Sequence, residues 1–513
     1  AVSGTSLAVN GTTTINGVSV TTTGAQSYSG AVTLGAATTL TATGVTFDAA
    51  VSGTSLAVNG TTTINGGSVT TTGAQSYSGA VTLGADTTLA STSVVAANAG
   101  ITLSSTLDSA DSTTPRALIL NSVGATTLGG AVGGIYPLSS LTTNAGGSLA
   151  INGGLVKTTG AQTYGEVATL GANATLQGVN VAFASTVDSV GSTPYSLTIS
   201  DSGTTVLGGS VGALHALSSL TTDSLTTAAG ETQIKGAQII TTGNAVFYDI
   251  VKVFNDVQLQ TGGDLKFMQT VNALQSLEVL NSNSTTFTGL VTAANSVVLT
   301  DTVDAHVIAF NGGLTTPTFT VAAEPFALTL RGTVNVSNGI NLANTGALQL
   351  NGSLTTNNQA ITVGQAGQTA TLLANTVFDS GTATTTVKGH LSGSAYTLGF
   401  ASPVNFSGTS NLTTSTTTFN KAVTASGDLT VNGATVVNGT GVNSGSYTQT
   451  YNGAVTVGRL ATDTTTFTGV GMTFGSTLDG TSRVMVADSG NTTYTGAIGG
   501  TTAPAHFETD AAG

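Results

Sequence analysis

Apolar and polar residues alternate along this chain in short runs. Examples are SLAV at Ser6–Val9, VTL at Val32–Leu34 and ALIL at Ala117–Leu120. Asn-Gly, Gly-Gly and Asp-Ser pairs separate the runs. Alternation with a period of two residues predicts short β-strands, and the Gly, Asn and Asp residues between them predict tight turns. Almost no stretch has the period of a helix, so the pattern predicts an all-β fold.

The alternating pattern is itself repeated. The sequence of Ala1–Leu40 recurs at Ala50–Leu89, an offset of 49 residues (50 − 1), with Val18 replaced by Gly67 and Ala37 replaced by Asp86. Weaker copies are TTGAQTYGEVATLGANATL at 158–176 and YTQTYNGAVTVG at 447–458. Self-similarity at a regular offset is the sequence signature of a repeat architecture.

A second kind of segment alternates with the first. It begins STLDSADSTTPRALIL at Ser105, STVDSVGSTPYSLTIS at Ser185 and STLDGTSRVMVADSG at Ser476. A full unit therefore spans 87 residues between Gly73 and Gly160 (160 − 73), and the 49-residue offset is interpreted as the same unit without its second segment. We predict that one unit forms about four coils of roughly 22 residues, which gives about 23 coils in the chain.

Composition excludes several classes of protein. Only 6% of the residues are charged, against roughly a quarter in ordinary globular chains, while 39% are hydrophobic. No apolar run approaches the roughly 18 to 20 residues of a membrane-spanning helix, so no transmembrane segment is predicted. With 68 Gly but only 7 Pro, the chain is also unlike collagen or a proline-rich linker.

The scarcity of large side chains favours one β architecture over the others. A sandwich or barrel of 513 residues would bury many aromatic rings, but this chain has no Trp, 10 Tyr and 16 Phe. A right-handed parallel β-helix has a narrow core that small aliphatic residues fill, each packing on its equivalent about 4.8 Å away along the axis. We therefore predict an all-β, right-handed parallel β-helix, also called a β-solenoid, with the shape of an elongated rod.

Aromatic residues occupy equivalent positions in the repeats. They are Tyr28, Tyr77, Tyr164 and Tyr451, with Phe247 filling the same position after the TTG at 241–243. Our prediction is that these rings have a structural role, filling or capping one corner of the coil. The alternative, an aromatic ribbon on which sugars stack, requires the rings to lie on the outside.

The middle of the chain departs from the repeat. Between about Glu231 and Asn281 it carries several Lys, Asp and Phe residues in longer alternating runs such as AVFYDIVKVF. We interpret residues 231–445 as diverged coils between repeat solenoid at 1–230 and at 446–513, all within one continuous solenoid.

Charge and cysteine content bear on partners and location. The net charge is −13 with only 10 Lys and Arg, so the sequence argues against nucleic acid as a partner. The absence of Cys makes folding independent of redox state, as expected of a bacterial surface protein that crosses an envelope before it folds. Outward Thr and Ser, and sequons such as Asn10-Gly-Thr12, are candidate carriers of glycans.

Catalytic and metal-binding residues are not predicted. The acids are scattered in turns, as at Asp108 with Asp111, Asp301 with Asp304, or Asp201 alone, where an Asp side chain usually bonds its own backbone. Calcium between coils at Asp108 and Asp111 is the alternative that we considered, and it would require carbonyl ligands from neighbouring coils. The four histidines, at 215, 306, 390 and 506, lack metal-ligand spacing. We expect no enzyme activity and no cofactor.

Several strings resemble a known family. TTTGAQSYSGAVTLGADTTL, ATTLGGAVGG, LSSLTTNAGGSLAINGG and HFETDAAG are similar to the degenerate repeats of giant secreted bacterial surface proteins, the filamentous-haemagglutinin-like adhesins. The resemblance covers most of the chain and is weakest in the middle. It implies an exported β-helix at the cell surface or outside the cell that serves in adhesion, in a biofilm or in a fibre, and it carries over no catalytic residues.

The two ends suggest how copies would assemble. TTNAGG at 142–147 is followed directly by SLAINGG, while the chain closes with ETDAAG and opens with AVSGTSLAVNG. Joined end to start, the solenoid pattern would continue, so we expect a homopolymer stacked head to tail in an extracellular filament. A segment of one much longer fibre is the competing interpretation, and an adhesin that attaches to cells, a host or a biofilm is the alternative function.

Overall fold

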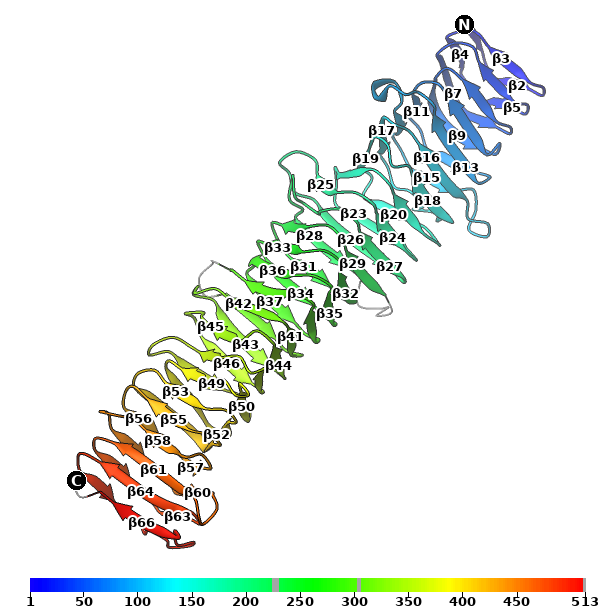
Figure 1. Ribbon diagram of the computed structural model, residues 1–513. Helices are drawn as coiled ribbons and strands as arrows, with labels where there is room; N and C mark the ends of the chain where they lie inside the picture. Colours follow the sequence, from blue (N-terminus) through cyan, green and yellow to red (C-terminus); the bar gives the residue numbers. More distant parts are fainter. Residues whose placement is uncertain (224–229, 302–305, 511–513) are drawn as a thin grey trace. The chain divides into compact units, whose positions relative to one another are not determined.

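The protein is a parallel β-solenoid of about 25 turns, which confirms the predicted all-β solenoid fold (Figure 1). The structure is a computed structural model, and it describes residues 1–223, 230–301 and 306–510. These residues form 66 short strands, a single 3₁₀ turn, η1 (Ala96–Asn98), and no α-helix. The observed number of turns is slightly larger than the predicted 23, because the average turn is slightly shorter than the predicted length of roughly 22 residues.

The coils group into two compact units, residues 1–264 and 265–513. In the first unit each turn contributes one strand to each of three parallel faces. The first face contains β1 (Val2–Gly4), β4 (Ser19–Thr22), the first half of β7 (Thr38–Phe47), the first half of β9 (Leu56–Ile64), β11 (Gln75–Tyr77), β14 (Ile101–Leu103), β17 (Ala125–Leu128), β19 (Ser148–Ile151), β22 (Val167–Leu170), β25 (Val187–Ser189), β30 (Gln238–Thr241) and β33 (Val257–Thr261).

The second face of this unit starts at β2 and includes the second halves of β7 and β9. It contains β2 (Leu7–Val9), β5 (Gln26–Tyr28), β12 (Val81–Leu83), β15 (Leu107–Ser109), β20 (Leu155–Lys157), β23 (Ala174–Gly178), β26 (Ser196–Asp201), β28 (Ser219–Thr222) and β31 (Ala245–Phe247).

The third face of this unit starts at β3. It contains β3 (Thr13–Ile15), β6 (Val32–Leu34), β8 (Val51–Gly53), β10 (Ser68–Thr71), β13 (Thr87–Ser91), β16 (Ala117–Asn121), β18 (Ser140–Thr143), β21 (Gln162–Tyr164), β24 (Val181–Phe183), β27 (Thr204–Leu207), β29 (Glu231–Ile234) and β32 (Ile250–Val253).

Alternation of side chains explains why these sequences form the faces. In Thr87–Ser91, Thr87, Leu89 and Ser91 are buried while the residues between them are only partly covered. Leu89 lies beside Val69 in the coil before it and beside Leu120 in the coil after it, so each inward residue packs on an inward residue of the next turn. Outward Thr and Ser occupy the alternate positions, where β-branched side chains suit a pleated surface.

The second unit has the same three-faced coil. One face contains β36 (Leu277–Asn281), β39 (Ser296–Leu299), β42 (Thr318–Val321), β45 (Ile340–Leu342), β48 (Ile361–Val363), β51 (Thr385–Val387), β53 (Val404–Phe406), β55 (Val423–Ala425), β58 (Gly441–Asn443), β61 (Thr464–Gly469), β64 (Arg483–Asp488) and β66 (His506–Thr509).

Another face of the second unit contains β34 (Asp264–Phe267), β37 (Ser284–Phe287), β40 (Val307–Phe310), β43 (Ala327–Arg331), β46 (Leu348–Asn351), β49 (Thr369–Leu372), the first parts of β52 (His390–Phe400) and β54 (Ser410–Phe419), β56 (Leu429–Val431), β59 (Gln449–Tyr451), β62 (Met472–Phe474) and β65 (Thr492–Tyr494). The remaining face contains β35 (Val271–Ala273), β38 (Val291–Ala293), β41 (Leu314–Thr316), β44 (Val334–Val336), β47 (Leu354–Thr356), β50 (Thr376–Asp379), the second parts of β52 and β54, β57 (Ala434–Val437), β60 (Val455–Val457) and β63 (Leu478–Gly480).

Aromatic rings stack along the core of the second unit. The Phe267 and Phe287 rings are 5.0 Å apart, and Phe287 lies 4.7 Å from Phe310, each pair nearly parallel. Phenylalanine rings from successive coils therefore pack on one another from β34 to β40. Offset stacking of this kind contributes about 0.5–1.5 kcal/mol per pair beyond the burial of area.

The sequence repeat is not a whole number of turns. On the first face, Tyr77 pairs with Leu103, and the pairing continues through Leu128 to Ile151, which is three turns. Two further faces, crossed by β20 and β21, lead to Tyr164. The 87-residue unit therefore makes three turns and two further faces, one face fewer than four complete coils.

The shorter and the later offsets behave in the same way. From Tyr28 the pairing runs through Phe47 to Ile64, two turns, and two more faces lead to Tyr77. From Tyr164 three turns lead to Ile234, and two more faces lead to Phe247. Each copy of the repeat is thus displaced by one face from the copy before it. The second segment, which the 49-residue offset lacks, contributes one complete turn.

Within the described residues, no helix has the length and apolar character needed to cross a membrane.

Candidate functional site

The five repeat-equivalent rings all lie in the core. Tyr28, Tyr77, Tyr164, Phe247 and Tyr451 each have 0% exposed surface. Tyr28, Tyr77 and Tyr164 lie on the second, first and third faces of the first unit, respectively, as the displacement of the repeat requires. Because the rings point inward, none is placed where a sugar in solvent could stack on it.

The tyrosines belong to a hydrogen-bonded corner that the sequence encodes as T-x-G-x-Q-x-Y. At one such corner the Gln162 Nε2 donates to Val156 O (3.3 Å), Thr158 Oγ1 (3.2 Å) and Gln177 O (2.7 Å). The Thr158 hydroxyl donates to Gly160 O, and the Tyr164 hydroxyl donates to Gln162 Oε1 at 2.8 Å. Burial raises the pKa of Tyr164, so its hydroxyl stays protonated and remains a donor.

The same network recurs at the other two copies of the motif and, in a variant form, around Gln449, where Ser444 supplies the hydroxyl in place of Thr. Gln26, Gln75 and Gln449 make equivalent bonds to three acceptors, and each accepts from the tyrosine two residues later. The glutamine amide thus adds a second donor to carbonyls that the backbone also reaches, as at Gln177 O, which accepts from Thr158 N at 2.9 Å. The spacing of Thr, Gln and Tyr is therefore accounted for by corner geometry.

The acids singled out in the sequence act mainly on the backbone. The Asp108 carboxylate accepts from Ile135 N (2.8 Å) and Tyr136 N (3.2 Å) of the next coil, and so holds a loop whose Ile135 side chain is 73% exposed. Asp111 accepts from Thr113 N and from Thr114 N, both at 2.8 Å. Because the Thr113 hydroxyl and these two amides donate to it, the pKa of Asp111 lies below its usual range.

The Asp108 arrangement occurs once in each copy of the second segment. Asp188 accepts from Leu214 N and His215 N, and Asp479 accepts from Thr501 N and Thr502 N. In a sequence, this function is visible only as an Asp that follows a Leu or Val at the same place in each copy. Asp108 and Asp111 thus bind amides of different segments, and the structure gives them no shared ligand position.

Three carboxyl groups gather at one corner of the first unit. Asp201, Asp223 and Asp249, from three successive coils, are each 2% exposed. Asp201 accepts from Val181 N (2.9 Å), Gly203 N (3.2 Å) and Thr205 Oγ1 (3.1 Å), and Asp249 accepts from Thr232 Oγ1 (2.9 Å). The sequence indicated Asp201 alone, because Asp223 and Asp249 lie 22 and 48 residues farther along the chain (223 − 201; 249 − 201).

Asp223 is the unusual member of this group. Its Oδ1 accepts from Asp201 N at 2.9 Å, while its Oδ2 is buried with no donor directed at it. A Cβ on Gly230 would lie 3.1 Å from this Oδ2 and 3.4 Å from Asp249 Oδ2, so the absence of a side chain at Gly230 leaves room for both oxygens. Burial, and then the adjacent Asp249 carboxylate, raises the pKa of Asp223 to about 8.

The residues that could ligate a metal do not converge. Within residues 1–223, 230–301 and 306–510, no group of three His, Cys, Asp or Glu side chains could hold a metal ion. His390 Nδ1 accepts from Asn411 N at 3.1 Å, and His506 lies 3.6 Å from Glu508. Of the predicted pair Asp301 and Asp304, Asp301 is buried in the core, and Asp304 lies outside the described residues.

The charged middle segment places two lysines around one ring. The Nζ atoms of Lys235 and Lys252 lie 5.1 and 5.3 Å from the centroid of the half-buried Phe254. Each ammonium group is within the range of a cation–π interaction, which contributes about 0.5–1 kcal/mol at an exposed site. The ring is thus covered by its own lysines.

A groove in the second unit combines charge, amides and an exposed apolar group. It has a volume of about 610 Å³. Four successive turns contribute to it, after β52, β54, β57 and β60, so that it follows one corner of the solenoid. Its lining includes the side chains of Asn420, Lys421, Asn438, Arg459, Leu460 and Asp463.

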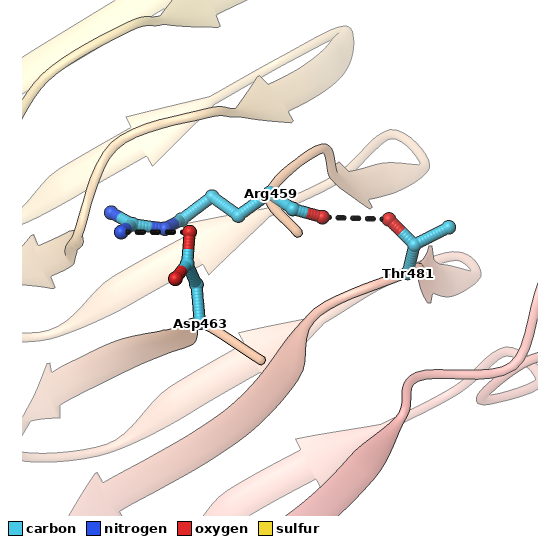
Figure 2. Close-up of polar contacts among 3 residues, drawn as sticks. All are labelled: Arg459, Asp463 and Thr481. Atoms are coloured by element: carbon cyan, nitrogen blue, oxygen red, sulfur yellow. Dashed lines mark hydrogen bonds and ion pairs between the residues drawn. The ribbon is translucent and has the colours of Figure 1, made fainter. Parts of the chain in front are cut away.

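Arg459 is fixed in this groove from two sides, as Figure 2 shows. Its Nη2 lies 3.2 Å from Asp463 Oδ2, and its carbonyl oxygen accepts from Thr481 Oγ1 at 2.7 Å (Figure 2). Its Nε is buried and donates to no acceptor. No sequence pattern indicates this groove, because its residues come from four turns with no motif in common.

Comparison with known proteins gives no identification: no family model, no curated protein and no solved structure matches the chain.

Proposed function

We propose that the protein is an extracellular structural protein, a subunit or segment of a surface filament or stalk. The single observation that carries this proposal is the use made of the chain's buried polar groups. The corner glutamines, the loop-holding aspartates and Asp201 all bond to backbone groups of their own or the adjacent coil. The polar chemistry of the chain is thus directed at joining one coil to the next.

Stacking of coils is the proposed mechanism of the filament. In a solenoid each coil contacts only its neighbours, so stability is close to a sum of similar interfaces and length adds resistance to unfolding. The contacts that join coils within a unit are alike, since inward apolar residues of one coil meet inward apolar residues of the next. We propose that copies associate head to tail through the same kind of contact, which is a heterologous interaction and so does not close.

A surface or extracellular location fits the same proposal. Only 33 of 513 side chains are charged (10 + 23), and the chain has no Cys. Folding without disulfide chemistry suits a chain that folds after export. Glycans on outward Thr, Ser or Asn side chains would make so weakly charged a surface more soluble.

Adhesion is the second candidate function, and the groove at Arg459 favours it. The exposed side chains of Lys421 and Leu460 line the same groove, so a cation and an apolar group lie together on the surface. An adhesive segment would use such a surface to bind a molecule outside the fibre.

Electron cryo-microscopy of the full chain tests the filament proposal. We expect continuous fibres whose cross-section is a three-sided coil, at a protein concentration where a control with a folded domain fused to one terminus stays unassembled. Separate particles of uniform length in both samples, at every concentration tried, would contradict head-to-tail association. Adhesion would then become the leading function.

A further inference from the structure

We propose that Asp223 and Asp249 share one proton and so form an alkali-sensitive contact between two successive coils of the first unit. Asp223 follows β28 and Asp249 follows β31, and these strands pair in register, with Thr222 beside Phe247. Each of the two aspartates has 2% exposed surface. The proposal concerns how one coil is held to the next, and it stands whether or not the protein forms filaments.

The bond between the two carboxyl groups requires that one of them carry a proton. The side chains of Asp223 and Asp249 are hydrogen-bonded to each other. A carboxylate can only accept, whereas a protonated carboxyl has one O–H donor. The Asp223 Oδ1 accepts from Asp201 N at 2.9 Å, and its Oδ2 is buried with no donor directed at it. A bare carboxylate oxygen there would have lost its water without a replacement, so Oδ2 is the expected position of the proton.

The other bonds of Asp249 make it the acceptor of the pair. Its Oδ1 accepts from the Thr232 hydroxyl at 2.9 Å and from the Thr222 hydroxyl at 3.5 Å. Donors of this kind stabilise an ionised carboxylate. The proton therefore lies on Asp223 Oδ2 and is donated to Asp249.

The two carboxyl groups meet in the space beside Gly230. The position of a Cβ on this residue is close to both Oδ2 atoms, and it is 2.6 Å from the carbonyl oxygen of Gly203, which is closer than real Cβ contacts come. A side chain at residue 230 would therefore displace the backbone or separate the pair.

The preceding copy of the repeat shows that this position does not need an acid. The string SLTT precedes both Asn144 and Asp223, so the two residues are equivalent. Asn144 Oδ1 accepts from Ser122 N at 2.9 Å, as Asp223 Oδ1 accepts from Asp201 N. An amide therefore makes this bond between coils as well as a carboxyl does. What the carboxyl adds is a proton that can be lost.

The charges that act on Asp223 are negative ones, from Asp249 and then Asp201. The other ionisable side chains of the strands around this corner are Glu231 at the start of β29, Tyr248 between β31 and β32, and Lys252 in β32. The Lys252 ammonium group lies 5.3 Å from the centroid of the Phe254 ring and is engaged there. Loss of the proton therefore leaves two adjacent carboxylates in a buried corner, where they repel each other.

The pH of the solution decides whether this contact is closed. Burial, and then Asp249, raises the pKa of Asp223 from 3.8 to about 8. The proton is present in acidic and neutral solution, where the contact is closed, and it is lost above about pH 8. We expect the corner between β28 and β31 to open there while more distant coils stay stacked, because each coil contacts only its neighbours.

Difference infrared spectroscopy of the full chain between pH 5 and pH 10 tests for the shared proton. We expect the carbonyl stretch of a protonated carboxyl at pH 7 and its loss near pH 8. Asp223→Asn should abolish this signal, and Asp249→Asn, which removes the negative acceptor, should move its loss to a pH at least about one unit lower. Asp111→Asn, at a partly exposed acid of the same unit, should leave the signal unchanged.

Hydrogen exchange at pH 7 and pH 9, corrected for the intrinsic rate at each pH, tests the opening. One pH unit above the pKa, proton loss favours the open corner about tenfold. Protection of residues 219–223 and 245–251 should therefore fall about tenfold in the parent and less than about threefold in Asp223→Asn. Protection of Thr87–Ser91, in more distant coils, should not change.

Three results would overturn the proposal. The first is a parent spectrum without a carboxyl signal that Asp223→Asn removes. The second is a signal lost at the same pH in the parent and in Asp249→Asn, which would show a proton held by burial alone. The third is an equal change of protection in the parent and in Asp223→Asn. Melting temperatures show whether each variant is folded, and Asp223→Asn, whose amide can donate to Asp249, serves if Asp249→Asn misfolds.

Discussion

Two polar corners of the first unit lie on the same edge of the solenoid, and different side chains form hydrogen bonds with the buried polar groups there. Thr158 and Gln162 form one, and Asp201, two coils later on this edge, begins the other. Gln162 provides donors to three acceptors and an acceptor to Tyr164. Asp223, in the next coil, can only accept when ionised, and one of its oxygens has no donor. The Gln162 amide satisfies its corner, whereas the Asp223 carboxyl leaves one oxygen without a donor.

Gln162→Glu should have the largest effect, because it converts the complete corner into a carboxyl corner. The variant loses the Nε2 donors to three acceptors and places a charge where there is no exposed surface. We expect a loss of at least about 3 kcal/mol in the local free energy of unfolding at pH 8. Hydrogen exchange of the coil around Val156 and Tyr164 measures it.

The matched control for this change is Gln177→Glu, at a partly exposed position in the following coil. It adds the same charge without removing a corner donor. We expect a loss below about 0.5 kcal/mol. Equal losses in the two variants would show that the Gln162 network does not stabilise the corner.

Asp223→Asn should raise the free energy of unfolding at pH 8, whereas Gln162→Glu lowers it. The ordinary pKa is 3.8 and that of Asp223 is about 8, so between these values the folded state holds a proton that the unfolded state has lost. The protonated Asp223 therefore contributes its full stabilisation below about pH 4. This contribution is lost as the pH rises from 4 to 8, and above pH 8 the free energy of unfolding no longer depends on this group. Asn at this position removes the dependence and, with the φ of 50° that Asn adopts readily, should stabilise the unit by on the order of 1–3 kcal/mol at pH 8.

Urea unfolding between pH 5 and pH 9 measures this slope in the parent and in the variant. The other groups that act on Asp223 are Asp201 and Asp249, both acidic, so no nearby cation reverses the sign. Asp111→Asn, at a site whose pKa lies below the usual range, should leave the slope unchanged in this pH window. A destabilised Asp223→Asn variant at pH 8 would show that Asp223 works as a carboxylate.

Tyr164→Phe should have the smallest effect. It removes the donor to Gln162 Oε1 and leaves the ring in place, which costs about 1 kcal/mol. Tyr28→Phe and Tyr77→Phe should cost the same, although the three rings lie on three different faces. Local hydrogen exchange at each corner measures the loss of local unfolding free energy in the three variants. A difference above about 1 kcal/mol between them would show that the stabilisation by this hydrogen bond depends on the face.

Much of the fold follows from local pattern. Thr87–Ser91 reads as a half-buried strand from its alternation alone, and the structure shows that alternation. The rings at 28, 77 and 164 were found from the repeat, because identical motifs require identical local packing. The groove at Arg459 could not be found in this way, since Asn420, Asn438 and Arg459 are brought together by the spacing of coils and share no local signal. Asp223 and Asp249 meet for the same reason.

The sequence by itself determined the strands, the turns, the repeat and the solenoid class, because these depend on alternation over a few residues and on copies that fold alike. Only the tertiary structure decided which face each copy occupies. One turn consists of three strands and the three corners that follow them, and the corners vary in length. One turn takes 26 residues from Tyr77 to Leu103 (103 − 77) but only 19 from Tyr28 to Phe47 (47 − 28). The repeat length therefore does not fix the number of turns, and equivalent residues arrive on different faces of the same unit.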